Sequence, residues 1–288
     1  MDVQLGERSP DAVEVTARLV EPVARRFFRY EMHGLESVPK GPCLLVGNHS
    51  GAGAVEIPCM LVAWYRHFGE ARPGYGLTNV VTMKNPLFAP WLSAIGAIPA
   101  SHDQARAAIG ARKDVLVFPG GDIDSFRPFY ETRKVVFGKR RGYIRLALEM
   151  GIPIVPLATI GSHLTYWMAP GNAWIAKRLR LKRPSVRLES VPLTVGMLAA
   201  AAAVGAAAVS IIDPVIALAF LGAAIVPFPS RITTQVLPAI DLQRDLPGDL
   251  GTEERVERGH QLVFHALQDA VKRMKHGEPF ATRATKST

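Results

Sequence analysis

Short apolar runs and amphipathic stretches alternate along the chain from about residue 43 to residue 158. The runs have the length and composition of buried strands, and the stretches between them repeat apolar positions at helical spacing. The expected strands are 30–38, 43–46, 79–83, 95–100, 114–118, 152–157 and 232–237, and the expected helices are 57–68, 86–93, 102–111, 142–150 and 253–275. The prolines of 152–157 indicate an edge strand, or one paired only in its middle. The alternation predicts an α/β fold with a mainly parallel sheet flanked by helices, in which sites form beyond the carboxyl ends of strands.

A further helix is predicted near the N-terminus, where Ser9 can cap it and Pro10 takes its first position. Its apolar positions recur every four residues and are Val15, Leu19, Val23 and Phe27. Pro22 lies inside this pattern, so the helix is expected to kink or restart there. Such an amphipathic helix, within residues 1–31, can pack on the core or lie in a bilayer interface, and core packing is the expected outcome.

Two long uncharged runs, 191–212 and 215–230, are joined by Asp213-Pro214. They predict an apolar helical hairpin, residues 191–229, inserted into one domain of residues 32–288. Ala-rich helices without a polar face favour contact with a membrane over burial in a soluble core. Basic residues between 177 and 187, together with Arg231, place the flanks of the hairpin on the cytoplasmic side. Spanning and re-entrant insertion both remain open.

The overall charge supports a membrane surface as a partner. The net charge is +9 at pH 7, and 48% of the residues are hydrophobic. A basic chain implies an anionic partner, and the basic cluster at 177–187 directly precedes the most apolar stretch, which favours an anionic membrane surface over nucleic acid. The two cysteines, Cys43 and Cys59, lie in apolar stretches and are expected to be buried thiols rather than a disulfide.

The candidate chemistry lies at the ends of two expected strands. The first strand ends in Asn48-His49-Ser50-Gly51, and the second runs into Phe118-Pro119-Gly120-Gly121-Asp122-Ile123-Asp124-Ser125-Phe126-Arg127. An imidazole at a strand end can act as a general base near pH 7, or it can simply be a hydrogen-bonded histidine at a capped strand end. Two adjacent glycines permit close backbone approach and can offer amides to an anion.

Together these segments resemble the PlsC-type glycerolipid acyltransferases. The resemblance is closest to the branch containing diacylglycerol acyltransferase 2, in which Phe-Pro-Gly-Gly replaces Phe-Pro-Glu-Gly. It is carried by 48–51, 96–101, 118–127 and 154–156, in that order, within residues 34–160. The resemblance implies that His49 is the general base for transfer of a fatty acyl group from acyl-coenzyme A, or acyl carrier protein, to a lipid hydroxyl. It implies no covalent acyl-enzyme and no cofactor. The histidines other than His49 and His163 form no metal-ligand spacing with cysteines or acids, so no catalytic metal is expected.

The same resemblance suggests which residues contact the substrates. The expected set is Asn48, Ser50, Gly51, Phe118, Pro119, Gly120, Gly121, Arg127, Arg141 and His163. Backbone amides near Gly120-Gly121 or near Ser50-Gly51 are the expected donors to the oxyanion.

The chain departs from the family pattern at two places. The carboxylate that orients the histidine is replaced by Ala54, which leaves Glu56 first and Asp124 second as candidate partners of His49. The arginine of the second segment is also absent, because Ala100-Ser101 stands there. A lysophospholipid is the first expected acceptor, and diacylglycerol or another neutral alcohol is its rival. A lipid-binding homologue without activity and a lipid hydrolase are alternatives of other classes, although no Gly-x-Ser-x-Gly nucleophile motif is present.

Overall fold

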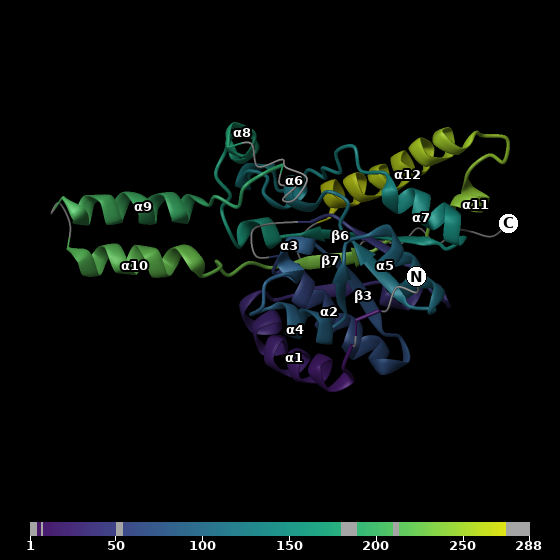
Figure 1. Cartoon of the computed structure of the whole chain (residues 1–288), viewed down its shortest axis with the longest axis horizontal. Helices are drawn as coiled ribbons and strands as arrows, with labels where there is room; N and C mark the ends of the chain where they lie inside the picture. The colour runs from purple at the N-terminus through teal and green to yellow at the C-terminus, as the bar shows by residue number, and fades with distance from the viewer. Residues whose placement is uncertain (1–4, 7, 50–53, 180–188, 210–212, 275–288) are drawn as a thin grey trace.

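The computed structural model describes residues 5–6, 8–49, 54–179, 189–209 and 213–274 (Figure 1). These residues form a seven-stranded sheet in the order β1-β7-β6-β2-β5-β3-β4. The strands are β1 Glu31–His33, β2 Leu44–Gly47, β3 Gly74–Thr78, β4 Ala97–Pro99, β5 Asp114–Val117, β6 Ile154–Ile160 and β7 Thr233–Val236. Every neighbouring pair is parallel except β6 and β7. The predicted α/β fold with a mainly parallel sheet is therefore confirmed.

Helices cover both faces of this sheet, and two further helices, α9 and α10, project away from it. They are α1 Pro10–Pro22, α2 Glu56–Phe68, α3 Val80–Met83, α4 Ala89–Ala94, α5 His102–Gly110, α6 Gly121–Ser125, α7 Gly142–Met150, α8 Asn172–Arg178, α9 Val195–Ala208, α10 Pro214–Ile225, α11 Leu242–Asp245 and α12 Thr252–Arg273. Because side chains alternate along a strand, Leu44 and Val46 of β2 pack with α5, α7 and α12, whereas Leu45 packs with α2 on the other face. Cys43 and Cys59 are free and buried, as predicted.

Local signals set the ends of several helices. The Ser9 hydroxyl accepts a hydrogen bond from the amide of Ala12 at 3.2 Å, so it caps α1 as predicted. Gly151 ends α7 in the left-handed conformation that glycine adopts most easily, with φ +61°. At Pro22 the helix does not stop but widens into a π-helical turn, Val23–Phe27. These boundaries follow from residues within one turn of the helix end.

The expected core-facing side of α1 is wrong. Val15, Leu19 and Val23 are 55%, 72% and 48% exposed, whereas Val13 and Ala17 are buried. The helix packs through its small residues, and Trp91 of α4 donates a hydrogen bond to Thr16 at 3.0 Å. Small side chains allow α1 to lie close to its neighbours, which leaves the larger apolar stripe on the outside.

The strand expected at 79–83 is also wrong. Residues Val80–Met83 form the short helix α3, and the strand lies just before it, at Gly74–Thr78. Its backbone pairs with both β4 and β5, and its buried side chain is Tyr75. The two glycines of this strand hid it, because glycine is depleted in strands and common in turns.

Strand β6 lies inside the sheet and not at its edge, contrary to the prediction. It extends to Ile160 and pairs with β2 on one side and β7 on the other. Pro156 has no amide to donate, but its carbonyl still accepts from Leu237 at 2.9 Å. Ile154 also exchanges two backbone hydrogen bonds with Ile240, so the strand loses little pairing at its proline.

Helices α9 and α10 lie side by side and project away from the sheet (Figure 1). They are antiparallel, because Gly196 near the start of α9 approaches Ala224 near the end of α10. Leu198, Val209 and Leu218 are between 47% and 67% exposed, so the pair is not buried in a soluble core. Residues 210–212, which connect the helices, lie outside the described part of the chain. No helix among the described residues combines the length and apolar character needed to cross a bilayer.

Candidate active site

The carboxyl ends of β2 and β5 bring the two sequence segments together. The strands are neighbours, with Val46 opposite Val117, so Asn48-His49 and Phe118 emerge at the same edge of the sheet. A Cβ on Gly47 would lie 2.6 Å from the Phe118 ring, so a glycine is needed for that ring to pack against β2. The Phe118 ring in turn stacks on the His49 imidazole, with centroids 4.6 Å apart.

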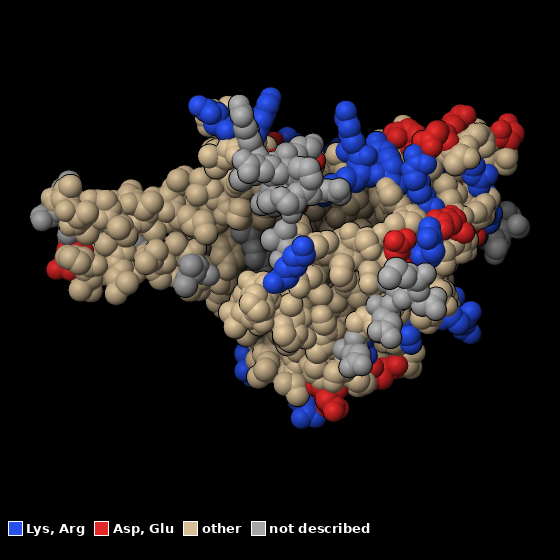
Figure 2. Space-filling model, in the orientation of Figure 1, with Lys and Arg blue, Asp and Glu red and all other residues tan. Residues whose placement is uncertain are grey.

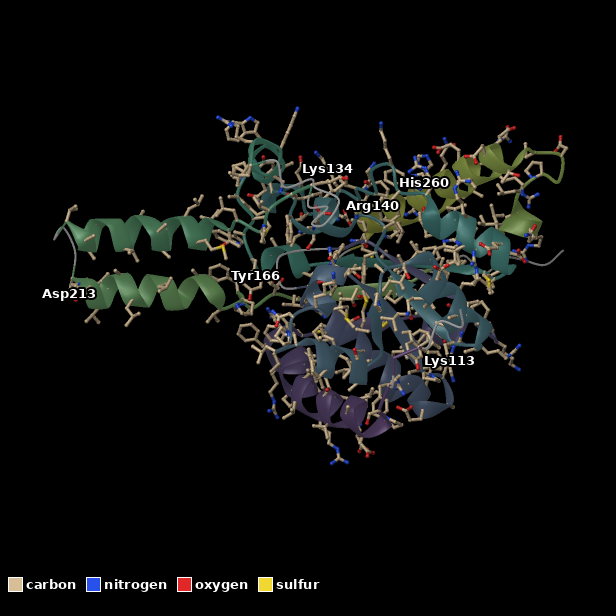
Figure 3. The ribbon with its side chains drawn as sticks, viewed as in Figure 1. Lys113, Lys134, Arg140, Tyr166, Asp213 and His260 are labelled. Carbon is tan, nitrogen blue, oxygen red and sulfur yellow. The ribbon has the colours of Figure 1, made fainter. Side chains whose placement is uncertain are left out.

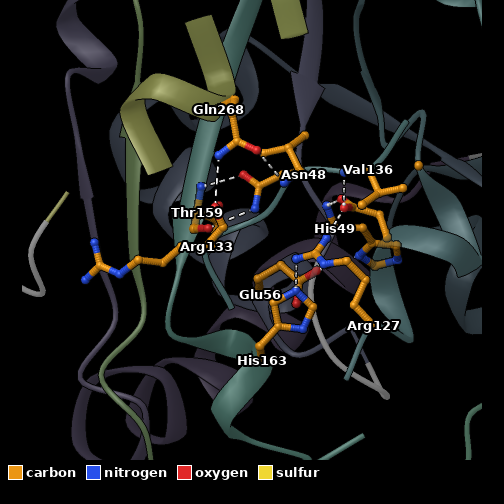
Figure 4. A network of polar contacts seen from close by, with 12 residues as sticks. Asn48, His49, Glu56, Arg127, Arg133, Val136, Thr159, His163 and Gln268 are labelled. Atoms are coloured by element: carbon orange, nitrogen blue, oxygen red, sulfur yellow. Dashed lines mark hydrogen bonds and ion pairs between the residues drawn. The ribbon is translucent and has the colours of Figure 1, made fainter. Parts of the chain in front are cut away.

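Asn48 anchors the strand end instead of facing a substrate. Its amide nitrogen donates to the carbonyl of Thr159 at 2.9 Å, and its amide oxygen accepts from the Thr159 amide at 2.8 Å. The side chain is 1% exposed. The predicted substrate contact by Asn48 is therefore wrong: its hydrogen-bonding capacity holds β2 to β6 just before His49 (Figure 4).

The imidazole of His49 contacts a buried carboxylate. Nδ1 lies 2.6 Å from Oε1 of Glu56, and the Glu56 side chain is fully buried. Because a carboxylate accepts hydrogen bonds, this contact favours the tautomer of a neutral imidazole that has its proton on Nδ1 and its lone pair on Nε2. The His49 side chain is 16% exposed, so the ring is held on one side and open on another. This is the geometry of a histidine that can accept a proton.

A local turn explains how Glu56 reaches the ring from an unexpected position. Ala54, which stands where the family has its acid, has a φ of +48°. After this left-handed residue, Val55 caps α2, whose first residue is Glu56. The carboxylate therefore lies both in the first turn of a helix, where the helix dipole favours negative charge, and against His49.

Asp124 holds the main chain of His49 and not its ring. One carboxylate oxygen accepts from the amide of His49 at 2.6 Å, and the other accepts from the amide of Val136 at 2.7 Å. The residue is fully buried and pairs with Arg127. Burial raises the pKa of Asp124 to about 6, against the opposing effects of Arg127 and the two backbone amides.

Arg127 and His163 form a buried pair behind Asp124 (Figure 4). The Arg127 guanidinium donates to the Asp124 carboxylate and to Nε2 of His163, and both side chains are at most 4% exposed. Burial, followed by the charges of Arg127 and His49, lowers the pKa of His163 well below its usual value. In the described part of the chain, Nε of Arg127 and Nδ1 of His163 have no hydrogen-bond partner. The two residues expected to contact substrate thus brace the loop that carries Asp124.

The two glycines allow close packing. A Cβ on Gly120 would overlap Asp124 and the carbonyl of Val136. The amide of Gly121 donates to Phe118 at 3.1 Å, which removes it as the predicted oxyanion donor. Arg140 donates to the carbonyls of Pro119 and Gly120 at 3.3 and 3.0 Å, so it clamps the segment from the outside.

The remaining predicted residues are dispersed. Arg141 forms an ion pair with Glu257 of α12 at 2.8 Å, apart from the His49 ring. Ser50 and Gly51 lie outside the described residues. No group of three His, Cys, Asp or Glu side chains in the described ranges is arranged to hold a metal ion.

Sequence reasoning missed three contributors to this arrangement. Arg140 is one of several basic residues between positions 133 and 145, and that clustering was its only signal in the sequence. The backbone groups of Val136 and Thr159 had no signal, because a main-chain hydrogen bond leaves no trace in residue type.

Comparison with known proteins agrees with these observations. The model of a protein family described as Acyltransferase matches residues 29–160. Phytyl ester synthase 1 of Arabidopsis thaliana is 29% identical over 133 residues, which cover 44% of this chain and 19% of that protein. The human DGAT1/2-independent enzyme synthesizing storage lipids is 26% identical over 149 residues, which cover 51% of this chain and 45% of that protein. The aligned segments thus span less than half of each relative.

A solved structure also resembles the chain. It is the 1-acyl-sn-glycerophosphate acyltransferase PlsC from Thermotoga maritima, with a TM-score of 0.49 and 15% identity over 90% of this chain and 82% of that one. The family match and the named relatives, two of which synthesise lipid esters or storage lipids, confirm the resemblance to the PlsC type and support the branch containing diacylglycerol acyltransferase 2. Residues 29–160, somewhat less than half of the chain, thus match the family described as Acyltransferase and resemble its PlsC type.

Proposed function

We propose that the chain transfers a fatty acyl group from acyl-coenzyme A to the hydroxyl of a lipid, with His49 as general base and Glu56 as its orienting carboxylate. The observation that carries this proposal is the 2.6 Å contact between Nδ1 of His49 and Glu56 at the carboxyl end of β2. It fixes the tautomer in which Nε2 can take a proton. A histidine that only capped a strand end would not need a fully buried carboxylate behind its ring.

The proton and bond changes follow from this geometry. The acceptor hydroxyl gives its proton to Nε2 of His49 while its oxygen bonds to the thioester carbon. The tetrahedral intermediate then breaks its carbon–sulfur bond, and the imidazolium returns the proton to the departing thiolate. Glu56 stabilises the transient positive charge on the ring, and general base catalysis of this kind contributes about 10²–10⁴-fold to a rate.

The charges near the site support a neutral acceptor ahead of a lysophospholipid. Arg127 is buried and engaged by Asp124 and His163, and Arg141 is paired with Glu257. Ala100 occupies the place of the arginine that would contact a phosphate in the family. Because these cations are absent or already paired, we favour a neutral lipid alcohol such as diacylglycerol or a long-chain alcohol.

The acceptor is tested with purified full chain, radiolabelled acyl-coenzyme A and a panel of diacylglycerol, a long-chain alcohol, lysophosphatidylcholine and lysophosphatidate. We expect labelled ester from a neutral alcohol at the highest rate. Faster transfer to the lysophospholipids would overturn the acceptor assignment. Release of free fatty acid alone would overturn the transferase in favour of a hydrolase, and lipid binding without any turnover would leave a non-catalytic lipid-binding protein.

We also propose that the α9–α10 pair contacts the membrane from which the acceptor comes. Neither helix contains a charged residue, and apolar side chains are exposed all along both. Figure 2 shows this projecting part of the molecule without Lys or Arg along its length. A continuous exposed apolar surface of this size is typical of an interaction with lipid or protein. Lipid fits the proposed reaction because the acceptor and product are both membrane components.

A further inference from the structure

A row of exposed aromatic side chains lies at the root of the α9–α10 pair. It consists of Phe129, Tyr130, Trp167 and Phe228, which are between 36% and 64% exposed, and we call these four residues the aromatic row. The Trp167 ring contacts two others, with centroids 5.7 Å from Phe129 and 5.4 Å from Phe228, and Tyr130 lies 5.5 Å from Phe129. A contiguous set of exposed large rings indicates a surface that meets a partner.

Backbone hydrogen bonds fix the aromatic row to both ends of the helix pair. The carbonyl of Trp167 accepts from the amide of Val195, the first residue of α9, at 2.7 Å. The amide of Phe228, just after the end of α10, donates to the carbonyl of Thr165 at 2.7 Å. The rings of Trp167 and Phe228 are therefore held at the point where the two helices leave the body of the protein.

The two helices are long enough to enter a bilayer but not to cross it. Helix α9 has 14 residues and α10 has 12, so at about 1.5 Å per residue they extend about 18–21 Å from the aromatic row. The hydrocarbon core of a bilayer is about 30 Å thick. Figure 3 labels Tyr166 at the root of the pair and Asp213 at its far end. A pair inserted up to the row would thus place its far end beyond the middle of the bilayer and short of its other side.

The charge of Asp213 opposes insertion of the far end. Asp213 is the only charged residue between positions 190 and 230, and its carboxylate caps α10 by accepting from the amide of Val215 at 2.7 Å. One charge at the centre of a bilayer lowers partitioning by about a hundredfold. Burial of one large apolar side chain raises it by about tenfold. The exposed side chains of Val215, Ile216 and Leu218 therefore outweigh this single charge.

Cationic side chains lie beside the aromatic row on α8. Asn172, the first residue of α8, donates to the carbonyl of Leu193 at 3.1 Å, which ties this helix to the segment that enters α9. Trp174, Lys177 and Arg178 of α8 are exposed, and Figure 2 shows Lys and Arg side chains over this helix. Trp and Tyr rings collect at the level of lipid head groups, where Lys and Arg attract anionic lipids. Rings and cations at the root, followed by uncharged helices, match the layers of a bilayer surface.

The aromatic row also adjoins the segments that brace the candidate base. Phe129 and Trp167 follow closely in sequence after Arg127 and His163, which form the buried pair of the candidate site. Helices α3 and α6, which begin soon after the carboxyl ends of β3 and β5, lie on the side of the sheet toward α9 and α10 (Figure 1). A membrane that meets the row therefore lies on the side of the molecule that carries His49.

We propose that the aromatic row and the exposed side chains of α8 lie at the head-group level of a bilayer, with α9 and α10 inserted up to the row without crossing the membrane. This inference rests on the membrane contact in the proposed function and adds its depth and its boundary. The occupant of the row is the layer between head groups and acyl chains, because rings with a polar edge favour that layer. A lipid alcohol has its hydroxyl at the same level, on the side of the molecule that carries His49.

The row is tested by flotation of the full chain with vesicles of phosphatidylcholine and phosphatidylglycerol. Trp167→Ser and Phe228→Ser each remove a ring but keep the backbone groups that hold the helices. Leu262→Ser, at an exposed apolar position of α12, is the matched control, and Phe228→Tyr keeps a ring at the tested position. We expect each ring deletion to weaken vesicle binding about tenfold, as for the loss of one large apolar side chain from lipid. Phe228→Tyr and the control should bind as the wild type does.

The depth is tested by fluorescence quenching with lipids that carry a quencher near the head group or near the end of the acyl chain. Trp167→Phe identifies the part of the signal that comes from Trp167. Val215→Trp adds a ring at an exposed position near the far end of the pair. We expect the head-group quencher to act more strongly on Trp167, and the chain-end quencher to act more strongly at position 215. Equal quenching at both positions, or the reverse order, would overturn the proposed depth.

The outcomes separate the aromatic row from the proposed function. If Val204→Glu/Leu218→Glu loses vesicle binding but both ring deletions keep it, the row is overturned and the membrane contact of α9–α10 stands. If the full chain transfers acyl groups to a dispersed acceptor but does not bind vesicles, the row and the membrane contact fail and the acyl transfer stands. A dimer in solution that the ring deletions convert to monomers would assign the surface to a second copy of the chain and overturn the bilayer.

Discussion

Each side chain around His49 has a distinct structural task. Glu56 contacts Nδ1 and fixes the tautomer, and the Phe118 ring supports the face of the imidazole. Asp124 accepts the backbone amide of His49, so it positions the residue without touching its ring. Asn48 ties the strand end to Thr159. The ring of His49, its backbone amide and the preceding residue Asn48 are thus each held by a different partner, as expected for a preorganised base.

The buried pair of Arg127 and His163 gives the protein a predictable response to acid. The unfolded chain binds a proton on this imidazole as the pH falls below about 6.5, whereas the pKa in the folded protein lies well below that value. The folded state therefore binds fewer protons, and its stability falls as the pH decreases. We expect this group alone to remove up to about 1.4 kcal/mol of unfolding free energy per pH unit below 6.5.

The measurement is chemical denaturation at pH 7.5, 6.5 and 5.5 for the wild type and His163→Asn, which keeps a polar side chain but does not titrate. The loss between pH 7.5 and 5.5 should be smaller in the variant, whatever its stability at pH 7.5. Equal losses in the two proteins would show that His163 is protonated normally in the folded state. His260, whose pKa is also lowered, should contribute with the same sign in both proteins.

At the scale of elements, local signals were predictable and pairing partners were not. Ser9 and Gly151 act within one turn of a helix, so the sequence around them was enough to place the starts or ends of α1 and α7. The position of β6 depends on β2 and β7, which are distant in sequence. Pro156 indicated an edge strand, but β2 and β7 pair with β6 on both sides. The apolar stripe of α1 was wrongly expected to face the core for a similar reason. The elements that pack against α1 contact its small residues, which the sequence of the helix alone does not reveal.

The α9–α10 pair is the element whose role is easiest to test. We expect the full chain to float with phosphatidylcholine vesicles and Val204→Glu/Leu218→Glu to lose at least about tenfold in binding, because a charge in an apolar lipid environment costs about 2–3 kcal/mol. Both residues are exposed, so the substitutions leave the fold intact. Leu262→Glu, on an exposed position of α12, is the matched control and should bind as the wild type does.

Vesicle binding by the double variant equal to that of the wild type would remove the membrane role of these helices. If the double variant and the control both lost binding, the effect would come from the added negative charge anywhere on the protein and not from α9–α10. The same preparations can be compared by circular dichroism to establish that all three proteins are folded.

At the scale of the whole molecule, the sequence located the site but not all of its contacts. His49 and the Gly120-Gly121 segment were found because they follow recognisable strands, and parallel strands end at one edge of a sheet. The positions of Arg140 and Val136 were not found, because both reach the site from a loop that is held to Gln268 of α12, which is distant in sequence. Arg127 and Arg141 were identified in the sequence as cations that could contact a phosphate. In the structure, Arg127 is paired with Asp124 and Arg141 with Glu257, so neither is open to a phosphate.

The arrangement of surfaces suggests how the proposed reaction is organised. The apolar helices α9 and α10 project from one end of the molecule, whereas Lys and Arg side chains mixed with Asp and Glu side chains lie over α7 and α12 (Figures 1 and 2). The base lies at the carboxyl edge of the sheet, where Asp124 accepts the backbone amides of both His49 and Val136. In the proposed reaction, the lipid acceptor would arrive from the membrane that α9 and α10 contact.

The central claim is that the His49–Glu56 pair removes the proton from the acceptor. The most direct test is the initial rate of labelled ester formation by the full chain, compared with His49→Ala and Glu56→Gln. The exposed pair His102–Glu149, whose atoms are 2.9 Å apart, supplies matched controls in His102→Ala and Glu149→Gln. The account predicts that the first two variants lose about 10²–10⁴-fold in rate, as expected for the loss of a general base, while the controls keep the wild-type rate. Ester formation by His49→Ala at the wild-type rate would contradict it.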